Sequence, residues 1–198
     1  MPEYKNVKYD ECDNVYEPAE DTFLLIDNLA VNEDMDVLEI GGGCGLVSIH
    51  ASLKAKNVDV CDINPYAIKC IEHNIKLNNI KNIHIIKSDL FENIDKVYDL
   101  ILFNTPYLPV ETEEHNDDEY SKAWDGGVDG REVIDRFLKE APEYLKEDGT
   151  IQLVQSSFSD NQKTLEILNN NGFKAEITEN IHMFFEDITL ITAHRSEL

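Results

Sequence analysis

The stretch that decides the fold is Asp36-Val-Leu-Glu-Ile-Gly-Gly-Gly-Cys-Gly45, an apolar run that leads directly into a glycine-rich turn. The run has the length of a short buried strand, and Leu46–Lys54 beyond the turn has helical spacing. Strands that alternate with helices form βαβ units with a parallel sheet, so we predict a doubly wound, seven-stranded α/β fold. The other strands are expected at Asn57–Ile63, Ile83–Lys87, Asp99–Asn104, Thr150–Ser156, Phe173–Thr178 and Ile188–Ala193. The other helices are expected at Tyr66–Leu77, Arg131–Leu145 and Asp160–Asn170.

Length and composition favour one domain, which we place across residues 1–198. A chain of 198 residues with 42% hydrophobic content fills one core. No stretch approaches the roughly 18–20 apolar residues that cross a bilayer, and the first residues lack the apolar centre of a secretory signal. We therefore predict a cytoplasmic protein with no membrane partner. The cysteines, Cys12, Cys44, Cys61 and Cys70, have neither a disulfide-framework nor a zinc-ligand spacing, so we interpret them as reduced packing residues and expect no metal site.

The net charge of −23 restricts the choice of partners. Such a surface repels phosphate backbones, and the chain has only three arginines, so direct nucleic-acid binding is not expected. A basic protein segment would be attracted, although the acidity also serves solubility. The run Glu111–Tyr120 carries six carboxylates and is interpreted either as a solvated loop or as a surface that attracts a basic substrate.

The glycine turn favours a cationic ligand over a phosphate. Gly41, Gly43 and Gly45 are spaced G-x-G-x-G, one residue tighter than the G-x-G-x-x-G turn that binds a pyrophosphate at a helix N-terminus. Glu39 precedes the turn, and a carboxylate there suits the amine of a methionine-like cofactor. A packing turn without a ligand is the alternative.

Carboxylates also follow the second and third strands. Asp62 ends the second, where a carboxylate accepts hydrogen bonds from both hydroxyls of a ribose; a helix cap or turn residue is the alternative. After the third, Asp89 would accept from an adenine amine while Leu90 donates its backbone N–H. Because parallel strands end at the same edge of a sheet, we expect these side chains to meet Glu39 there.

The most specific element is Asn104-Thr105-Pro106-Tyr107, at the end of the fourth strand. An amide or aromatic amine nitrogen is a poor nucleophile because its lone pair is delocalised. A site that methylates it needs two acceptors, here the Asn104 side-chain oxygen and the Thr105 carbonyl, and a flat surface, here Tyr107. With a sulfonium methyl donor, positioning contributes most of the rate and no strong base is required. A non-catalytic loop is the alternative.

Together these motifs resemble the HemK-like glutamine methyltransferases of translation release factors, most closely the short archaeal and eukaryotic branch. The resemblance runs in order from about Val15 to the C-terminus. It includes Val15-Tyr-Glu-Pro-Ala-Glu-Asp-Thr-Phe-Leu-Leu25, Ala123-Trp-Asp-Gly-Gly127 and Gly130-Arg-Glu-Val. It implies a Rossmann-like class I methyltransferase with strand order 3-2-1-4-5-7-6 and an antiparallel last strand. It also implies transfer of the methyl group of S-adenosyl-L-methionine to the side-chain amide nitrogen (N5) of the glutamine in a Gly-Gly-Gln loop of a class I release factor, leaving S-adenosyl-L-homocysteine.

The resemblance also implies roles for individual residues. The glutamine would be held by Asn104, Thr105, Pro106 and Tyr107. Residues 1–19 would form an extension that leads into the segment covering the cofactor. The cofactor would be bound by Thr22, Glu39, Gly41, Gly43, Asp62, Asp89, Leu90 and Asn104.

The resemblance further implies a small zinc-binding activator subunit that pairs at the third strand, Ile83–Lys87. That strand is expected to be outermost, and it has three isoleucines and no proline to discourage pairing. A loop that covers the edge is the alternative. Trp124 is expected either in the core or at the edge of a lid.

One position departs from the family pattern, because Thr105 stands where the Asn-Pro-Pro-Tyr signature has its first proline. The carbonyl at position 105 is retained, and Pro106 still favours an extended Thr105. The φ restraint of a ring at position 105 is lost, so the loop is expected to be less preorganised.

Two other substrates stay open beside glutamine. Lysine on a basic protein tail suits the acidity, although an Asn-x-Pro-Tyr site suits a planar amide better than an ammonium. Adenine-N6 in a nucleic acid shares the motif type, but the charge argues against it. A non-catalytic binding module is a further alternative.

Overall fold

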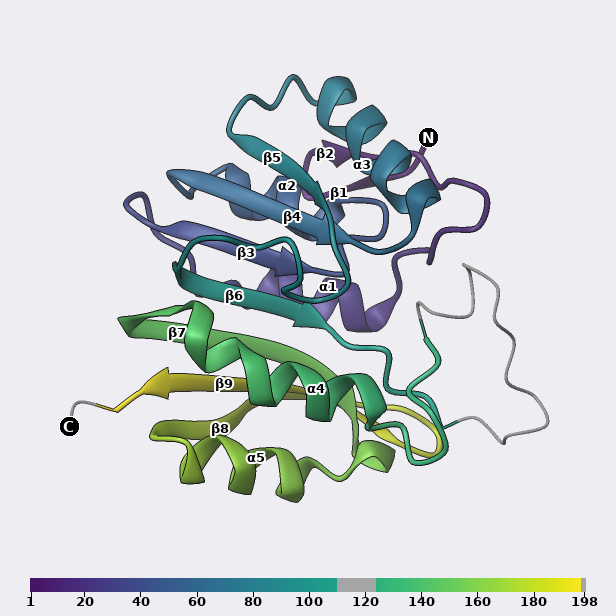
Figure 1. Ribbon diagram of the computed structural model, residues 1–198. Coiled ribbons are helices and arrows are strands. Elements are labelled where there is room, and N and C mark those ends of the chain that lie inside the picture. Colours follow the sequence, from purple (N-terminus) through teal and green to yellow (C-terminus); the bar gives the residue numbers. More distant parts are fainter. Residues whose placement is uncertain (110–123, 197–198) are drawn as a thin grey trace.

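The computed structural model describes residues 1–109 and 124–196, and within these ranges it shows a seven-stranded sheet with helices on both faces (Figure 1). The strand order β5-β4-β3-β6-β7-β9-β8 confirms the order that the resemblance implies. The last strand, β9, is antiparallel to both β7 and β8, and the other neighbours are parallel. The strands are β3 (Asp36–Ile40), β4 (Asn57–Asp62), β5 (Ile83–Lys87), β6 (Tyr98–Asn104), β7 (Leu145–Ser156), β8 (Phe173–His182) and β9 (Asp187–Arg195).

Five α-helices in the described ranges cover the sheet. They are α1 (Glu20–Asp27), α2 (Leu46–Ser52), α3 (Pro65–Leu77), α4 (Glu132–Glu140) and α5 (Asn161–Asn170), with short 3₁₀ turns η2 (Ala141–Tyr144) and η3 (Ser157–Ser159). α4 and α5 lie on one face, and α1, α2 and α3 lie on the other (Figure 1). Every helix in these ranges is too short or too polar to span a bilayer.

Alternation along the strands divides the core into two layers. Successive side chains of a strand point to opposite faces of a sheet. Val37 accordingly packs with Leu25 of α1 in one cluster, whereas its neighbour Leu38 packs with Phe137 of α4 in the other. All four side chains are fully buried. The near-continuous apolar character of β3 therefore reflects burial on both faces, as is typical of parallel sheets.

The expected helix over Arg131–Leu145 is wrong at its C-terminal end. α4 stops at Glu140, and Ala141–Tyr144 forms a 3₁₀ turn. Pro142 lacks the N–H that a continuing α-helix would use at that position. Leu145 is already in β7, which begins five residues before the predicted Thr150.

The N-terminal segment forms a hairpin that the sequence did not reveal. β1 (Glu3–Tyr4) pairs with β2 (Val7–Lys8) through a two-residue turn in which Lys5 and Asn6 have positive φ. Strands of two residues are too short to show a periodicity. The hairpin is fastened to α3, because Asn78 exchanges hydrogen bonds of 3.1 and 2.7 Å with the backbone of Lys8.

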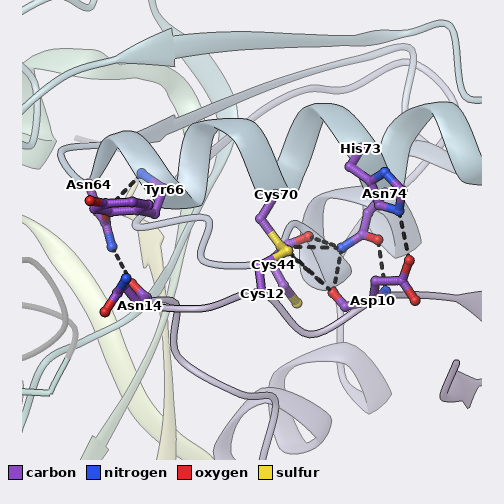
Figure 2. Close-up of a disulfide and its surroundings, with 9 residues drawn as sticks. All are labelled: Asp10, Cys12, Asn14, Cys44, Asn64, Tyr66, Cys70, His73 and Asn74. Atoms are coloured by element: carbon purple, nitrogen blue, oxygen red, sulfur yellow. Dashed lines mark hydrogen bonds and ion pairs between the residues drawn. A yellow bond between two sulfur atoms is a disulfide. The ribbon is translucent and has the colours of Figure 1, made fainter.

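The prediction that all four cysteines are reduced is wrong for Cys12 and Cys70, which form a disulfide between the N-terminal segment and α3 (Figure 2). They are separated by 58 positions in the sequence, so no local spacing indicates the pair, and only docking of the segment brings their Cα atoms to 6.1 Å. Asn74 of α3 supports the same contact by donating to the carbonyls of Asp10 and Cys44 at 3.1 and 2.8 Å. Cys44 and Cys61 are buried and free, as predicted.

Removal of the disulfide is expected to lower the free energy of unfolding by up to about 4 kcal/mol, because a cross-link over a loop of this length removes entropy from the unfolded chain. Chemical unfolding of Cys12→Ser and of the wild type, each with and without dithiothreitol, measures the effect. The reductant should shift the wild type to the midpoint of the variant and leave the variant unchanged. A wild type that unfolds at the same midpoint with and without reductant would contradict the bond.

Candidate active site

A cavity of about 330 Å³ lies at the carboxyl ends of β3, β4 and β6. This edge is where α/β proteins with parallel sheets bind ligands, and the volume is in the usual range for small-molecule sites. Every site residue predicted from the sequence lines the cavity. These are Thr22, Glu39, Gly41, Gly43, Asp62, Asp89, Leu90, Asn104, Thr105, Pro106 and Tyr107.

Strand register brings the predicted residues together. Ile40 of β3 is paired with Cys61 of β4 on one side and with Phe103 of β6 on the other. The residues that follow Cys61 and Phe103 are Asp62 and Asn104, so both side chains emerge level with the start of the glycine turn. β5 continues the row, since Lys87 pairs with Asp62.

The glycine turn is shaped by two different constraints. Gly42 allows close packing, because a Cβ there would lie 2.3 Å from a methyl group of Val60. Gly43 has a φ of +55°, and a Cβ there would meet no atom within 4 Å, so its backbone faces open space. Its N–H donates to Asp62 at 2.9 Å. The sequence singled out Gly41, Gly43 and Gly45 by spacing but not Gly42, which has the tightest contact of the four.

Asp62 holds the turn with both of its carboxylate oxygens. One oxygen accepts from Gly43 and the other from the backbone N–H of Asn64 at 2.8 Å. A carboxylate has about four acceptor positions, so Asp62 can hold the turn and also accept from a ligand. Of the two alternatives for Asp62, the helix cap is wrong, because Asn64 caps α3 by accepting from Tyr66 at 2.8 Å. The turn role agrees with the hydrogen bond that Asp62 accepts from Asn64.

Glu39 is a buried carboxyl group at the end of β3. It is only 2% exposed, and its carboxylate accepts a short hydrogen bond from the Ser48 hydroxyl of α2. Burial raises the pKa of Glu39 to about 8, and the hydrogen bond from Ser48 only partly offsets that effect. A buried carboxylate is stabilised by a cation beside it, so this position favours a positively charged ligand group.

The third strand contributes Asp89 and Leu90. Asp89 pairs with the Arg136 guanidinium of α4 at 3.1 Å, an interaction that the sequence did not indicate. Leu90 has a φ of +46°, in the left-handed region that non-glycine residues rarely adopt. The Ser88 hydroxyl donates to the Leu90 carbonyl at 2.9 Å and helps to hold this conformation. Strained backbone of this kind concentrates at ligand sites.

Asn104, the last residue of β6, has a side-chain oxygen that is buried and has no hydrogen-bond partner among the described residues. An unsatisfied buried acceptor costs about 1–3 kcal/mol and is rare in native structures. Asn104 lines the cavity, and a ligand that brings an N–H donor to this oxygen would satisfy it.

Thr105 holds the loop in place of the missing proline ring. Its hydroxyl and its backbone N–H both donate to the carbonyl of Val154 in β7, at 2.7 and 3.1 Å. A proline at position 105 could make neither bond. Two hydrogen bonds to the neighbouring strand therefore restrain the loop, so the expected loss of preorganisation is offset.

Asp21 of α1 is the main residue of the cavity wall that the sequence analysis missed. It is 4% exposed, and one of its oxygens accepts from both the Tyr16 and Tyr107 hydroxyls, at 3.0 and 3.2 Å. The other oxygen accepts from the backbone and hydroxyl of Thr22, at 2.6 and 3.2 Å. Burial, and then the charge of Asp21, raise the pKa of Tyr107 well above its usual range. The only available signal was the position of Asp21 beside Thr22 in the motif.

The segment that follows the acidic run closes the cavity on one side. Leu108 and Trp124 are joined by a backbone hydrogen bond of 3.0 Å, and Gly126 donates to Leu108 at 2.9 Å. Trp124 lines the cavity and is half-buried, so it does not belong to the core, and its place at the edge of a lid stays a prediction. The run Glu111–Tyr120 lies outside the described residues. Among the residues that are described, no cluster of three potential metal ligands occurs.

The fold, with the cavity at the strand ends, is that of a class I, Rossmann-like methyltransferase. A solved structure of the E. cuniculi Mtq2–Trm112 complex, responsible for methylation of the eRF1 translation termination factor, matches with a TM-score of 0.72 and 26% identity, over 92% of this chain and 99% of that one. A ribosomal protein L11 methylase of Lactobacillus delbrueckii matches with a TM-score of 0.69 at 21% identity, over 100% of this chain and 90% of that one, and supports the fold alone.

Sequence comparison identifies the family. The family model "Methyltransferase small domain" matches residues 17–120. A Methanocaldococcus jannaschii protein, provisionally named a protein N5-glutamine methyltransferase, is 47% identical over 98% of each chain. Human methyltransferase HEMK2 is 36% identical over 81% of this chain and 80% of its own. The chain belongs to the HemK-like methyltransferase family.

The raised pKa of Glu39 predicts a pH dependence of stability. Its carboxyl pKa is about 8 in the folded state and near the ordinary value of 4.5 in the unfolded state, so the folded state binds the proton more tightly. This contribution is fully present below about pH 4.5 and is lost as the pH rises through about 8. The unfolding free energy of the wild type relative to Glu39→Gln should therefore fall between about pH 5 and pH 9 in the absence of cofactor. A difference that is independent of pH would contradict the assignment.

Proposed function

We propose that this protein transfers a methyl group from S-adenosyl-L-methionine to the side-chain amide of the glutamine in the Gly-Gly-Gln loop of a class I translation release factor. The names of the relatives support the reaction, because they include a eukaryotic eRF1 methyltransferase catalytic subunit and a bacterial release factor glutamine methyltransferase. The observation that carries the proposal is the buried side-chain oxygen of Asn104, which has no hydrogen-bond partner within residues 1–109 and 124–196.

The geometry of the Asn104 loop suits a primary amide. A glutamine amide has two N–H donors, and its nitrogen must be held with the plane of the amide fixed. Asn104 Oδ1 would accept one N–H and the Thr105 carbonyl the other, while the ring of Tyr107 would lie against the amide plane. Asp21 would keep that ring in place, because it accepts the hydrogen bond of the Tyr107 hydroxyl. A lysine ammonium, with three donors and no plane, matches these groups less well.

The remaining cavity residues fit the proposed cofactor. Its sulfonium would supply an electrophilic methyl group, so the enzyme has to position the two reactants rather than provide a strong base. Glu39 would accept from the cationic amine, which would favour its ionised form. Asp62 would accept from the ribose hydroxyls, Asp89 and Leu90 would contact the adenine edge, and Thr22 would close the site from α1.

We propose a cytoplasmic location and a single domain across residues 1–198, in which the extension 1–19 leads into the covering segment. Both core layers pack on one sheet, and the N-terminal hairpin is fastened to α3, which supports the single domain. The Cys12–Cys70 disulfide is unusual for a reducing cytoplasm, except in hyperthermophilic organisms, whose intracellular proteins are rich in disulfides.

Replacement of Asn104 by alanine is expected to reduce glutamine methylation by about 10²–10³-fold, the usual cost of one positioned polar group in an active site. Transfer is measured by incubating the enzyme and labelled S-adenosyl-L-methionine with an intact release factor, a lysine-rich tail or an adenine oligonucleotide. The molecule that acquires the label identifies the substrate. Asn161→Ala is the matched control, since the buried side-chain oxygen of Asn161 also has no partner in the described part of the chain, but Asn161 does not line the cavity. Transfer to the tail or the oligonucleotide in place of glutamine would contradict the proposed substrate, and an active Asn104→Ala would contradict the proposed site.

The proposed partner is a small activator subunit that pairs with β5, zinc-binding as the resemblance implies. β5 is the outermost strand of the sheet, next to β4, and the related Mtq2 is in a solved complex with Trm112. The half-buried isoleucines of β5, Ile83, Ile85 and Ile86, provide an apolar edge that a partner strand would cover.

Introduction of a charge at this edge is expected to prevent formation of the complex without unfolding the enzyme. Ile85→Lys should abolish co-purification with the small subunit, because a lysine would be buried in the added strand pair. Ile177→Lys on β8, the outermost strand at the opposite edge, is the control. Co-purification that survives Ile85→Lys, or an enzyme that is fully active and soluble without the subunit, would contradict the proposal.

A further inference from the structure

The turn between β8 and β9 carries two phenylalanines that point into solvent. Phe184 is 91% exposed and Phe185 is 81% exposed, more than any other large hydrophobic side chain among the described residues. Their rings contact each other edge to face, with centroids 5.0 Å apart. Exposed apolar groups that gather in one place mark interaction sites more often than single exposed residues do.

The backbone of the turn is firmly held, so the outward direction of both rings is a property of the fold. Met183 donates to the carbonyl of Glu186 at 2.8 Å and closes the turn. The Glu186 carboxylate accepts a short hydrogen bond from Ser156, at the end of β7, and Asp187 donates to the Ser157 hydroxyl at 3.0 Å. Met183 packs against the core cluster of α1 and α2, while its neighbours Phe184 and Phe185 remain outside.

The turn is linked to the Asn104–Tyr107 loop that follows β6, because the backbone N–H of Asp187 donates to the Ser157 hydroxyl of η3 at 3.0 Å. The link runs through η3, where the Ser159 hydroxyl donates to the Tyr107 carbonyl at 2.7 Å. Phe158, also in η3, is 55% exposed. Glu186 is near enough to Tyr107 for its charge to contribute to the raised pKa of that phenol.

A fourth apolar side chain approaches the same loop from another direction. Val128 is 71% exposed, in the turn that joins Gly127 to Gly130. This turn lies directly against the loop, because a Cβ on Gly130 would be 2.4 Å from the Tyr107 carbonyl oxygen. We call Val128, Phe158, Phe184 and Phe185 the apolar rim. None of the four lines the cavity itself.

We propose that the apolar rim binds apolar side chains that flank the target glutamine in the protein substrate. This inference rests on the function proposed above. The cavity would receive one side chain, so residues on either side of that glutamine must pass over the surface outside it. The turns that carry the rim are bonded to, or packed against, the Tyr107 carbonyl of the loop that lines the cavity. Apolar contacts of this kind provide most of the affinity at protein interfaces, and charged groups contribute mainly to orientation and rate of encounter.

The charge of the chain favours a neutral or basic polypeptide over the other occupants of an apolar surface. A second copy would bring a further net charge of −23 against the first, which opposes self-association. An anionic membrane surface would be repelled for the same reason. A polypeptide with basic residues around an apolar segment would make apolar contacts with the rim and would be attracted by the negative charge around it.

The double variant Phe184→Ser/Phe185→Ser tests the rim through substrates of two sizes. The kcat/KM for an intact release factor should fall about tenfold or more, mainly through KM, because contacts far from the reacting atoms contribute to binding. The rate with a Gly-Gly-Gln tripeptide and the affinity for S-adenosyl-L-methionine should not change. Leu53→Ser is the matched control, because Leu53 is 61% exposed at the end of α2, where the chain turns back toward the start of β4.

The arms of the experiment separate the two proposals. A wild type that methylates no release factor glutamine overturns the proposed function, whatever the variants do. A wild-type enzyme that is active, with a double variant of unchanged kcat/KM on the intact factor, overturns the rim alone. Equal losses of kcat/KM on the intact factor and on the tripeptide would show that the turn only supports the cavity. A wild type that dimerises through these phenylalanines would assign the rim to self-association. Either result overturns the inference.

Discussion

Parallel hydrogen bonding of β3 with β4 on one side and with β6 on the other is the constraint on which the site depends. Because Ile40 pairs with Cys61 and with Phe103, the polar residues that follow these positions leave the sheet at one level. A shift of one residue would exchange the side chains of the two core layers and would displace these polar residues from one another. Asp62 of β4 then accepts from Gly43, which fastens the glycine turn to the end of the neighbouring strand.

Polar groups at this edge are buried to an unusual degree, and each is held by a different partner. Glu39 has the Ser48 hydroxyl and Asp21 has two tyrosine hydroxyls, whereas Asn104 retains an oxygen with no partner among the described residues. Groups that are satisfied give the cavity a rigid wall. A ligand with an N–H donor would satisfy the Asn104 oxygen. A cationic group beside Glu39 would stabilise its ionised form and lower its raised pKa.

The Asn104–Tyr107 loop is restrained from several directions at once. Thr105 is bonded to Val154 of β7, the Tyr107 carbonyl accepts from Ser159, and the Tyr107 hydroxyl donates to Asp21 of α1. These partners come from segments that are distant in the chain, so the loop is positioned by the assembled sheet rather than by its own sequence. A threonine in place of the family proline is compatible with this arrangement because hydrogen bonds replace the restraint of the ring.

The sequence by itself determined the strand order, through its family resemblance. It also determined the edge of the sheet at which the cavity lies and most of the residues that line it, because strand–turn–helix periodicity and short motifs are local signals. It could not indicate the Cys12–Cys70 pair, the role of Asp21 between two tyrosines, or the pairing of Asp89 with Arg136, since each depends on segments far apart in the chain. Only the tertiary structure decided these contacts, together with the outward placement of Phe184 and Phe185. Which side chains meet is set by how helices and turns dock on the sheet, and docking depends on packing across the whole core rather than on the spacing of neighbouring residues.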